Sequence, residues 1–430
     1  MGNTIERPKK MERIVLVGLE TPYSEKQFNP LHELEQLVKT AGGQVVGRLY
    51  QKRDRIIPTY YIGTGKAEEL SELVKELNAH LVIFDNDLTG AQVRNLEKLI
   101  NIRVIDRSEL ILAIFAKHAR SNQAKLQVEL AQLEYELPRL KRMWTHLSRF
   151  EGGIGTRGPG EKQIEEDKRV IRNRIAGLKR KLKVLERRKE REVKKRREEF
   201  TISFVGYTNA GKSTLMNALT GCNVYVSDQL FATLDTKTRL WCLGGGRRAL
   251  LSDTVGFIRN IPHHLIASFH ATLEEATRAD LLLHVVDASD KEAEQMIITV
   301  ESVLKEIGCE ANETILIFNK IDLLRDNVEL GILSRSSNKP GVTPVAVSAV
   351  TKEGFDILCE RVIQIMEKNW VTADLTFPVT EGRFLSFLAE KADIFSREYK
   401  GTSVEMRICM PAREWYKVAN NPSVEYKIVK

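Results

Sequence analysis

The chain has 430 residues, of which 42% are hydrophobic and 29% charged, and it carries a net charge of +8. This composition excludes wholesale disorder, and at roughly 100–200 residues per domain the length predicts two to four domains. No apolar run approaches the ~20 residues that span a bilayer, and residues 1–6 contain no secretory core, so we expect a cytoplasmic protein without a membrane span.

The five cysteines lie far apart and include no CxxC pair. They support neither a disulfide framework nor a zinc site.

Short apolar runs alternate with helical patterns between residues 12 and 118. The apolar runs predict strands at 14–17, 45–46, 60–62, 81–84 and 104–105. The periodic segments predict helices at 31–40, 66–77 and 91–100. Strands that alternate with helices are typical of a small parallel α/β layer, so we assign residues 1–119 to an N-terminal α/β domain.

Residues 120–198 have a different period. Apolar residues four and three apart form two heptad seams, at Leu126, Leu130, Leu133, Leu137 and Leu140 and at Ile171, Ile175, Leu178, Leu182 and Leu185. The Gly-rich segment 151–160 between them cannot be helical. We therefore predict an antiparallel, coiled-coil-like helical hairpin with a Gly-rich tip, and we expect Pro138 to interrupt its first arm. Two helices of an ordinary bundle are the alternative.

Positive charge is concentrated in this part of the chain. Residues 141–200 contain 21 lysines and arginines against 10 acidic residues, a net charge of +11, whereas the rest of the chain has 45 against 48. Such a concentration favours a polyanionic partner, nucleic acid first, over a merely solvated helix face.

A phosphate-binding motif follows the predicted strand 200–205. The segment from Gly206 to Ser213 is G-x-x-x-x-G-K-S, and a helical pattern follows at 214–219. In this setting backbone N–H groups surround the phosphates, Lys212 reaches the β- and γ-phosphates, and the Ser213 hydroxyl ligates Mg²⁺. The predicted phosphate site comprises Gly206, Tyr207, Thr208, Asn209, Ala210, Gly211, Lys212, Ser213 and Thr214.

Two later segments indicate that the base is guanine. The predicted strand 314–318 leads to Asn319, Lys320, Ile321 and Asp322. The Asp322 carboxylate can accept two hydrogen bonds from guanine, and adenine has no matching donors. The stem of Lys320 can cover the face of the base. A second predicted strand leads to Val347, Ser348 and Ala349, whose backbone can meet the guanine carbonyl.

Two further segments are expected to sense the γ-phosphate. The first comprises Asp253, Thr254, Val255 and Gly256 after the predicted strand 249–251. Asp253 would hold Mg²⁺, and the N–H of Gly256 would meet the γ-phosphate. The second comprises Phe231, Ala232, Thr233, Leu234 and Asp235. We choose Thr233 as the second Mg²⁺ hydroxyl, with Thr236 and Thr238 as rivals.

These motifs assign residues 199–370 to a P-loop domain with a parallel-rich sheet and helices on both faces. Residues 371–430 are expected to form a small α+β domain with a helix at 385–392 and a half-buried strand at 403–409. Nothing in this last segment signals chemistry. The fold class that the sequence predicts is therefore multidomain α/β.

The motifs resemble those of translation-factor-like GTPases, and nearly the whole chain resembles the HflX family. The resemblance rests on residues 60–66, the tip 155–163, the P-loop, and segments 231–235 and 253–258. It implies binding to the large ribosomal subunit and its rRNA, GTPase activity stimulated there, and splitting or rescue of stalled or stress-damaged ribosomes. It also implies that the hairpin tip approaches the peptidyl-transferase region.

Hydrolysis is expected to depend on positioning and charge neutralisation, with Lys212, Thr233 and Gly256 as the catalytic set and no general base. Phe257 stands where many GTPases place a water-orienting Gln, so it is a hydrophobic gate or switch-loop packing. We therefore expect slow intrinsic turnover and help from the partner. Asn209 either helps to hold K⁺ beside the phosphates or merely suits a tight turn.

The sequence thus predicts a monomeric, Mg²⁺-dependent GTP phosphohydrolase that cycles between GTP and GDP and controls its own association with the ribosome. One alternative is an ATP-dependent rRNA-remodelling enzyme that acts through the N-terminal domain. Residues 63–66 superficially resemble a phosphate loop there, although a helix-start turn is the better interpretation. Another alternative is a ribosome-biogenesis or RNA-binding factor in which GTP only switches conformation.

Overall fold

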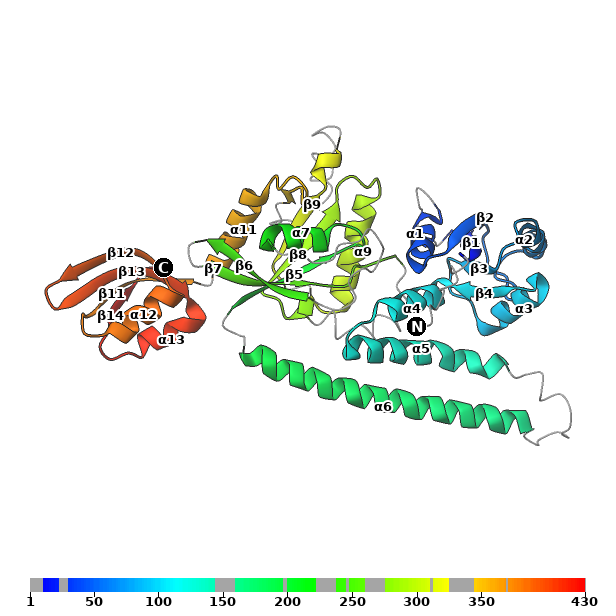
Figure 1. Cartoon of the computed structure of the whole chain (residues 1–430), viewed down its shortest axis with the longest axis horizontal. Helices are drawn as coiled ribbons and strands as arrows, with labels where there is room; N and C mark the ends of the chain where they lie inside the picture. The colour runs from blue at the N-terminus through cyan, green and yellow to red at the C-terminus, as the bar shows by residue number, and fades with distance from the viewer. Residues whose placement is uncertain are drawn as a thin grey trace, which may run out of the picture.

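A computed structural model describes residues 11–22, 30–143, 159–195, 199–221, 237–244, 247–259, 275–309, 312–324, 344–368 and 370–429. Within these ranges the chain forms sheets of four, six and four strands, which lie in a row with the helical hairpin running beneath two of them (Figure 1). This arrangement confirms the predicted multidomain α/β class. No helix in the described ranges has a stretch long and apolar enough to cross a membrane.

The N-terminal sheet is parallel, in the order β2-β1-β3-β4. Its strands are β1 (Arg13–Glu20), β2 (Gln44–Lys52), β3 (Leu81–Phe84) and β4 (Arg103–Asp106). Helices α1 (His32–Ala41) and α4 (Arg107–His118) pack on one face, and α2 (Thr64–Glu76) and α3 (Gly90–Ile100) on the other. Buried side chains on both faces explain why its strands are apolar throughout.

The strand expected at 60–62 is wrong. Tyr61 has a left-handed φ of 71° and forms only an isolated antiparallel bridge with Ile57. A left-handed residue cannot continue an extended strand. The apolar signal has another cause, because Tyr61 and Ile62 are buried in the core beneath α2.

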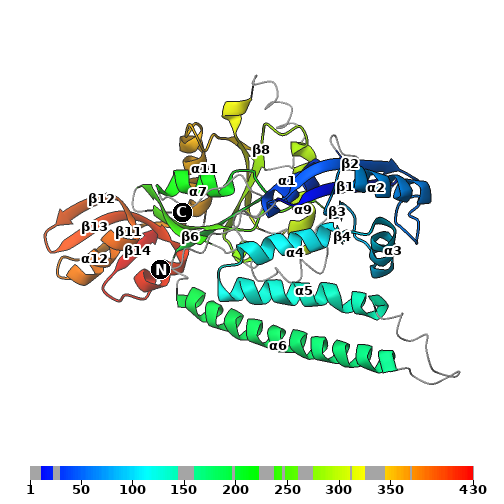
Figure 2. The same ribbon diagram turned by 45° about the vertical axis from the view of Figure 1, so that its right-hand side comes forward.

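The helical hairpin consists of α5 (Asn122–Met143) and α6 (Pro159–Lys195). The two helices run antiparallel (Figure 2). Leu130 contacts Leu178 and Leu182 in the seam between them. The predicted interruption at Pro138 is wrong, because α5 continues through Pro138 to Met143.

Asp106 attaches the hairpin to the N-terminal sheet. Its carboxylate is fully buried and accepts hydrogen bonds from the Tyr135 hydroxyl at 2.7 Å and from Arg139 Nη2 at 2.7 Å. It also accepts the backbone N–H groups of Leu88 and Glu109, the second as the N-cap of α4. These contacts stabilise α5 on both sides of Pro138, which explains how the helix tolerates a proline.

The central sheet has the order β10-β9-β8-β5-β7-β6, in which β6 and β7 are antiparallel and the other pairs parallel. Its strands are β5 (Phe200–Gly206), β6 (Lys237–Gly244), β7 (Arg247–Asp253), β8 (Leu281–Asp287), β9 (Thr314–Asn319) and β10 (Val345–Ala346). Helices α7 (Lys212–Thr220) and α11 (Phe355–Glu367) cover one face, and α9 (Ala293–Glu306) covers the other.

The C-terminal sheet is antiparallel, in the order β12-β13-β11-β14. Its elements are β11 (Trp370–Pro378), α12 (Gly382–Lys391), β12 (Asp393–Lys400), β13 (Ser403–Pro411), α13 (Ala412–Ala419) and β14 (Glu425–Ile428). The β-α-β-β-α-β order with helices on one face is ferredoxin-like.

Replacing Asp106 with Ala should loosen the hairpin. The change leaves Arg139 and Tyr135 without their buried acceptor, which costs about 3–5 kcal/mol. Hydrogen exchange of peptides that cover β4 and α5 should report this loss. Arg103→Gln is the matched control, because the Arg103–Glu109 pair is exposed and worth less than about 1 kcal/mol. Equal effects of the two changes would show that Asp106 does not anchor the hairpin.

Candidate functional site

The loop between β5 and α7 is shaped to surround an anion. Gly211 has a φ of 92°, and a Cβ there would lie 2.2 Å from the side-chain nitrogen of Asn319, so only glycine fits. The amine of Lys212 is buried inside the loop and donates to the carbonyls of Gly206 at 3.0 Å and Tyr207 at 2.7 Å. Burial lowers the pKa of Lys212 to about 8, although Asp253 opposes the shift. Thr214 lies in the first turn of α7.

A hydroxyl and a carboxylate meet beside this loop. Ser213 Oγ donates to Asp253 Oδ2 at 2.6 Å, and Asp253 is fully buried at the end of β7. Hard oxygen ligands of this kind suit Mg²⁺, so the two residues fit a magnesium site. The next residue, Thr254, is fixed against β5, because its hydroxyl donates to the carbonyl of Phe204.

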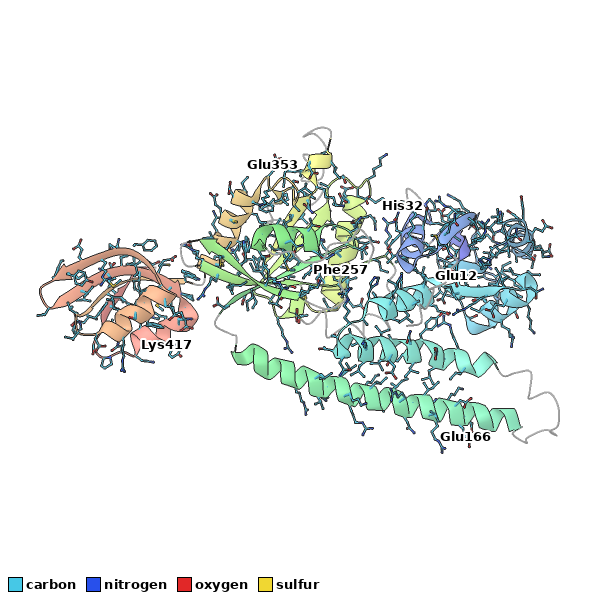
Figure 3. The ribbon with its side chains drawn as sticks, viewed as in Figure 1. Glu12, His32, Glu166, Phe257, Glu353 and Lys417 are labelled. Carbon is cyan, nitrogen blue, oxygen red and sulfur yellow. The ribbon has the colours of Figure 1, made fainter. Side chains whose placement is uncertain are left out.

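The segment after Asp253 lies against the phosphate loop. Phe257 N donates to the Gly206 carbonyl at 3.1 Å, and Thr208 N donates to the Phe257 carbonyl at 2.7 Å. A Cβ on Gly256 would lie 2.9 Å from the Lys212 amine, so its backbone is close to where a γ-phosphate would meet that lysine. Figure 3 labels Phe257 in the central domain. Its ring is buried among Val205, Tyr207 and Leu282 and serves as packing.

The residues predicted to recognise guanine converge at the carboxyl ends of β9 and β10. Asn319 connects the two loops, because it donates to the Ala210 carbonyl at 2.9 Å and accepts from Ala349 N at 3.1 Å. Ser348 Oγ donates to Asp322 Oδ1 at 2.5 Å, which orients that carboxylate. Val347 is buried and Ile321 opens a short 3₁₀ turn that carries Asp322.

Asp287 is a site residue that the sequence analysis missed. It ends β8, and its Oδ2 accepts from the Lys320 amine at 2.6 Å while its Oδ1 accepts from Ser289. The pair fixes the lysine stem that should cover the base. The sequence did contain a signal for Asp287, which is an acidic residue directly after the apolar strand 281–286.

A buried charge network between the N-terminal and central domains was also missed. Arg107, at the start of α4, contacts Asp85 at 2.6 Å, Glu33 at 2.9 Å and the Arg259 carbonyl at 3.1 Å. Arg259 N donates to the Tyr207 hydroxyl at 2.7 Å and to Glu33 at 3.2 Å. Burial raises the pKa of Tyr207, and the Glu33 carboxylate raises it further. The network therefore connects the phosphate loop to the N-terminal domain.

Some predicted residues lie outside the described ranges: Phe231, Ala232, Thr233, Leu234, Asp235 and the rival Thr236. Thr238 is described in β6, where its hydroxyl lies 3.1 Å from Ser252 Oγ. Asn209 has a left-handed φ of 61°, a conformation that asparagine adopts more readily than most residues.

A phosphate loop at the end of a parallel strand, followed by a buried Asp and a guanine-recognition segment, defines a P-loop GTPase. Comparison with known proteins agrees. Residues 29–116, 118–196 and 201–320 match three family profiles, described as GTP-binding GTPase N-terminal, GTP-binding GTPase middle region and 50S ribosome-binding GTPase.

The chain is 43% identical to the GTPase HflX of Caldanaerobacter subterraneus over 414 residues, 95% of this chain and 94% of that protein. It is 48% identical to the GTPase HflX of Alkalihalophilus pseudofirmus over 396 residues, 91% and 92% of the two chains. A solved complex of SsGBP with GDP aligns at 28% identity and a TM-score of 0.47, over 83% of this chain and 98% of that one. The chain belongs to the HflX family of GTPases, and it hydrolyses GTP.

The lowered pKa of Lys212 predicts a pH-dependent affinity for GDP. In the free protein the amine loses its proton as the pH rises through about 8, and the bound phosphates favour the charged form, so binding must take up a proton above pH 8. The affinity should fall by up to about tenfold per pH unit there. Calorimetry at pH 7.5 and 9 in buffers of different ionisation enthalpy measures this uptake. Equal proton uptake at the two pH values would contradict the prediction.

Replacing Ser348 with Ala should weaken guanine recognition. Loss of a hydrogen bond to a charged group costs roughly 1.5–3 kcal/mol, so the affinity for GDP should fall about 10-fold or more. The affinity for inosine diphosphate, which lacks the 2-amino donor, should fall less, because Asp322 is then less engaged. Thr351→Ala in the same loop is the control. If both nucleotides weaken equally, Ser348 only supports the loop.

Proposed function

We propose that this GTPase binds the large ribosomal subunit and its rRNA through the helical hairpin, is stimulated there, and uses hydrolysis to end the association. Splitting or rescue of stalled or stress-damaged ribosomes is the function that this cycle would serve. The observation that carries the proposal is the row of exposed basic residues on α6, formed by Arg169, Arg172, Arg180, Lys181, Lys183 and Arg187, whereas Arg174 and Lys179 pair with Glu129 and Glu134 of α5.

The basic residues of α6 and the apolar residues that pack against α5 lie on different sides of the helix. Leu178 and Leu182 are buried against α5, whereas the basic residues that lie between them in the sequence are exposed. A 37-residue helix extends about 55 Å at 1.5 Å per residue. The described exposed basic residues run from Arg169 to Arg187, about 27 Å of helix, and this stretch is suited to the phosphate backbone of RNA.

The proposed chemistry assigns a role to each described site residue. Ser213 and Asp253 would hold Mg²⁺, with Thr233 as a further hydroxyl, and the ion would neutralise charge on the β- and γ-phosphates. Lys212 would turn from the loop carbonyls to the phosphates, and the N–H of Gly256 would donate to the γ-phosphate. Asp322 would select guanine.

The position of Phe257 supports stimulation by a partner. Its ring is packed beneath the phosphate loop and cannot orient a water molecule. The attacking water therefore has to be positioned by something else, and rRNA or a ribosomal protein can supply that contact. K⁺ beside Asn209 would be an additional source of positive charge.

We further propose four functional units: an N-terminal domain at 1–119, the hairpin at 120–198, the GTPase domain at 199–370 and a small C-terminal domain at 371–430. In this division the hairpin binds RNA, and GTP hydrolysis in the GTPase domain ends the association with the large subunit.

A charge-reversal variant tests the role of the hairpin. Arg180→Glu, Lys183→Glu and Arg187→Glu together should weaken binding to purified large subunits and lower the slope of log affinity against log salt by about 2–3. The basal GTPase rate should stay unchanged, because none of the three residues touches the site. Reversal of the exposed Lys98 and Arg103 of the N-terminal domain serves as the control. An unchanged salt slope in the hairpin variant would refute the proposal.

The ATP-dependent alternative is tested by two further changes. Lys66 pairs with Glu69 inside α2 at 2.7 Å, and Gly63 N donates to Gln51, which favours a helix-start turn over a phosphate loop. Hydrolysis of GTP should be lost in Lys212→Ala and kept in Lys66→Ala. ATP hydrolysis with the opposite pattern would move the active site to the N-terminal domain.

The second alternative, a factor in which GTP only switches conformation, is tested with a non-hydrolysable GTP analogue. Normal release from the large subunit with this analogue would favour a conformational switch alone.

A further inference from the structure

The β6–β7 hairpin connects the nucleotide site to the C-terminal domain. At one end, Asp253 closes β7 and contacts Ser213 in the phosphate loop. At the other end stands Arg247, the first residue of β7. Six steps of about 3.3 Å separate the two residues, a span of roughly 20 Å along a single strand.

Arg247 joins three elements at the junction of the two domains. Its Nη2 lies 2.7 Å from Glu367 at the end of α11 and 2.6 Å from Asp393 at the start of β12. Its Cζ lies 5.7 Å from the centre of the Trp370 ring, at the start of β11. The side chain is only 18% exposed. A planar guanidinium can hold two carboxylates and an aromatic face at once, which a lysine cannot do.

The outer end of the hairpin is weakly restrained by its own sheet. Strand β6 is at the edge, and Leu240 on it is 45% exposed. Strand β7 pairs with β5 only from Ala249 onward, so Arg247 is paired with Gly244 of β6 but not with the inner strand β5. The register of the hairpin also shifts between Cys242 and Gly244. An edge hairpin with an irregular outer end can tilt or slide more easily than an inner strand.

We propose that the β6–β7 hairpin transmits the nucleotide state to the C-terminal domain, with Arg247 as the coupling residue. A shift of Asp253 and Gly256 on replacement of GDP by GTP moves β7, and with it Arg247 moves Asp393 at the start of β12 and Trp370 at the start of β11. Because coupling is reciprocal, a C-terminal domain held by a partner also biases the nucleotide preference of the site. This inference rests on the GTPase site described above.

Distances between the two domains test the coupling. Labels at exposed Asp356 on α11 and Glu398 on β12, introduced as non-natural amino acids into the full chain, report the separation by fluorescence transfer. The distance distribution should differ between GDP and a non-hydrolysable GTP analogue. In Arg247→Gln and in Asp393→Asn the difference should be lost, and the double variant should behave as either single one does.

Arg407→Gln is the matched control. Arg407 contacts Asp374 at 2.7 Å on the exposed face of the C-terminal sheet, so its loss removes an arginine–carboxylate pair without touching the junction. The control should keep the nucleotide-dependent difference, and Arg247→Gln should also change the ratio of GTP-analogue to GDP affinity by about threefold or more.

Two results would overturn the coupling. One is a distance distribution that is the same with both nucleotides, when each is shown to be bound by direct titration. The other is a difference that persists in Arg247→Gln. Failure to bind either nucleotide would instead refute the site itself, so the two proposals fail separately.

Discussion

The segment from Asp253 to Arg259 belongs to two domains at once, and the rest of the structure is arranged around it. Phe257 packs in the core of the central domain, whereas Val255 and Ile258 pack in the core cluster of the N-terminal domain. Side chains on opposite sides of one short stretch are thus buried in different hydrophobic cores. Because interiors are close-packed, this segment cannot shift without repacking both.

Two consecutive residues extend this constraint to the basic hairpin. Asp106 holds Tyr135 and Arg139 of α5, and Arg107, the next residue, holds the Arg259 carbonyl. The last residue of β4 therefore positions the hairpin, and the first residue of α4 contacts the segment that adjoins the phosphate loop. The junction between β4 and α4 thus connects the basic hairpin to the nucleotide site through buried carboxylate–guanidinium pairs. Arg247 makes a comparable junction on the opposite side of the central sheet.

Local patterns predicted the parts of this protein that depend on neighbouring residues in the chain. The phosphate loop and the strands around it follow from residues that adjoin in sequence, and the heptad seam at Leu130, Leu178 and Leu182 follows from helical period. The GTPase activity was predicted from the nucleotide-binding motifs and the family from a resemblance of the whole chain, and both are confirmed. The left-handed conformation of Tyr61 was missed, because an apolar run of buried residues has the same sequence pattern as a buried strand. Pro138 was misjudged because the anchor that tolerates it, Asp106, lies on another element.

The contacts between domains could not be predicted from local pattern. Arg259 and Glu33 are 226 positions apart, and neither belongs to a motif. The Asp287–Lys320 pair spans two strands that only the folded sheet brings together. Such contacts depend on long-range topology, which the hydrophobic pattern of a single sequence does not encode residue by residue.

We propose that contact with the ribosome completes a site that turns over GTP slowly on its own. The most direct measurement is GTP turnover in K⁺ buffer, with and without purified large ribosomal subunits and with ATP in parallel. We expect slow GTP turnover that rises about tenfold or more with subunits, and no comparable turnover of ATP. GTP turnover that is already fast without subunits, or that does not change when subunits are added, would contradict the proposal.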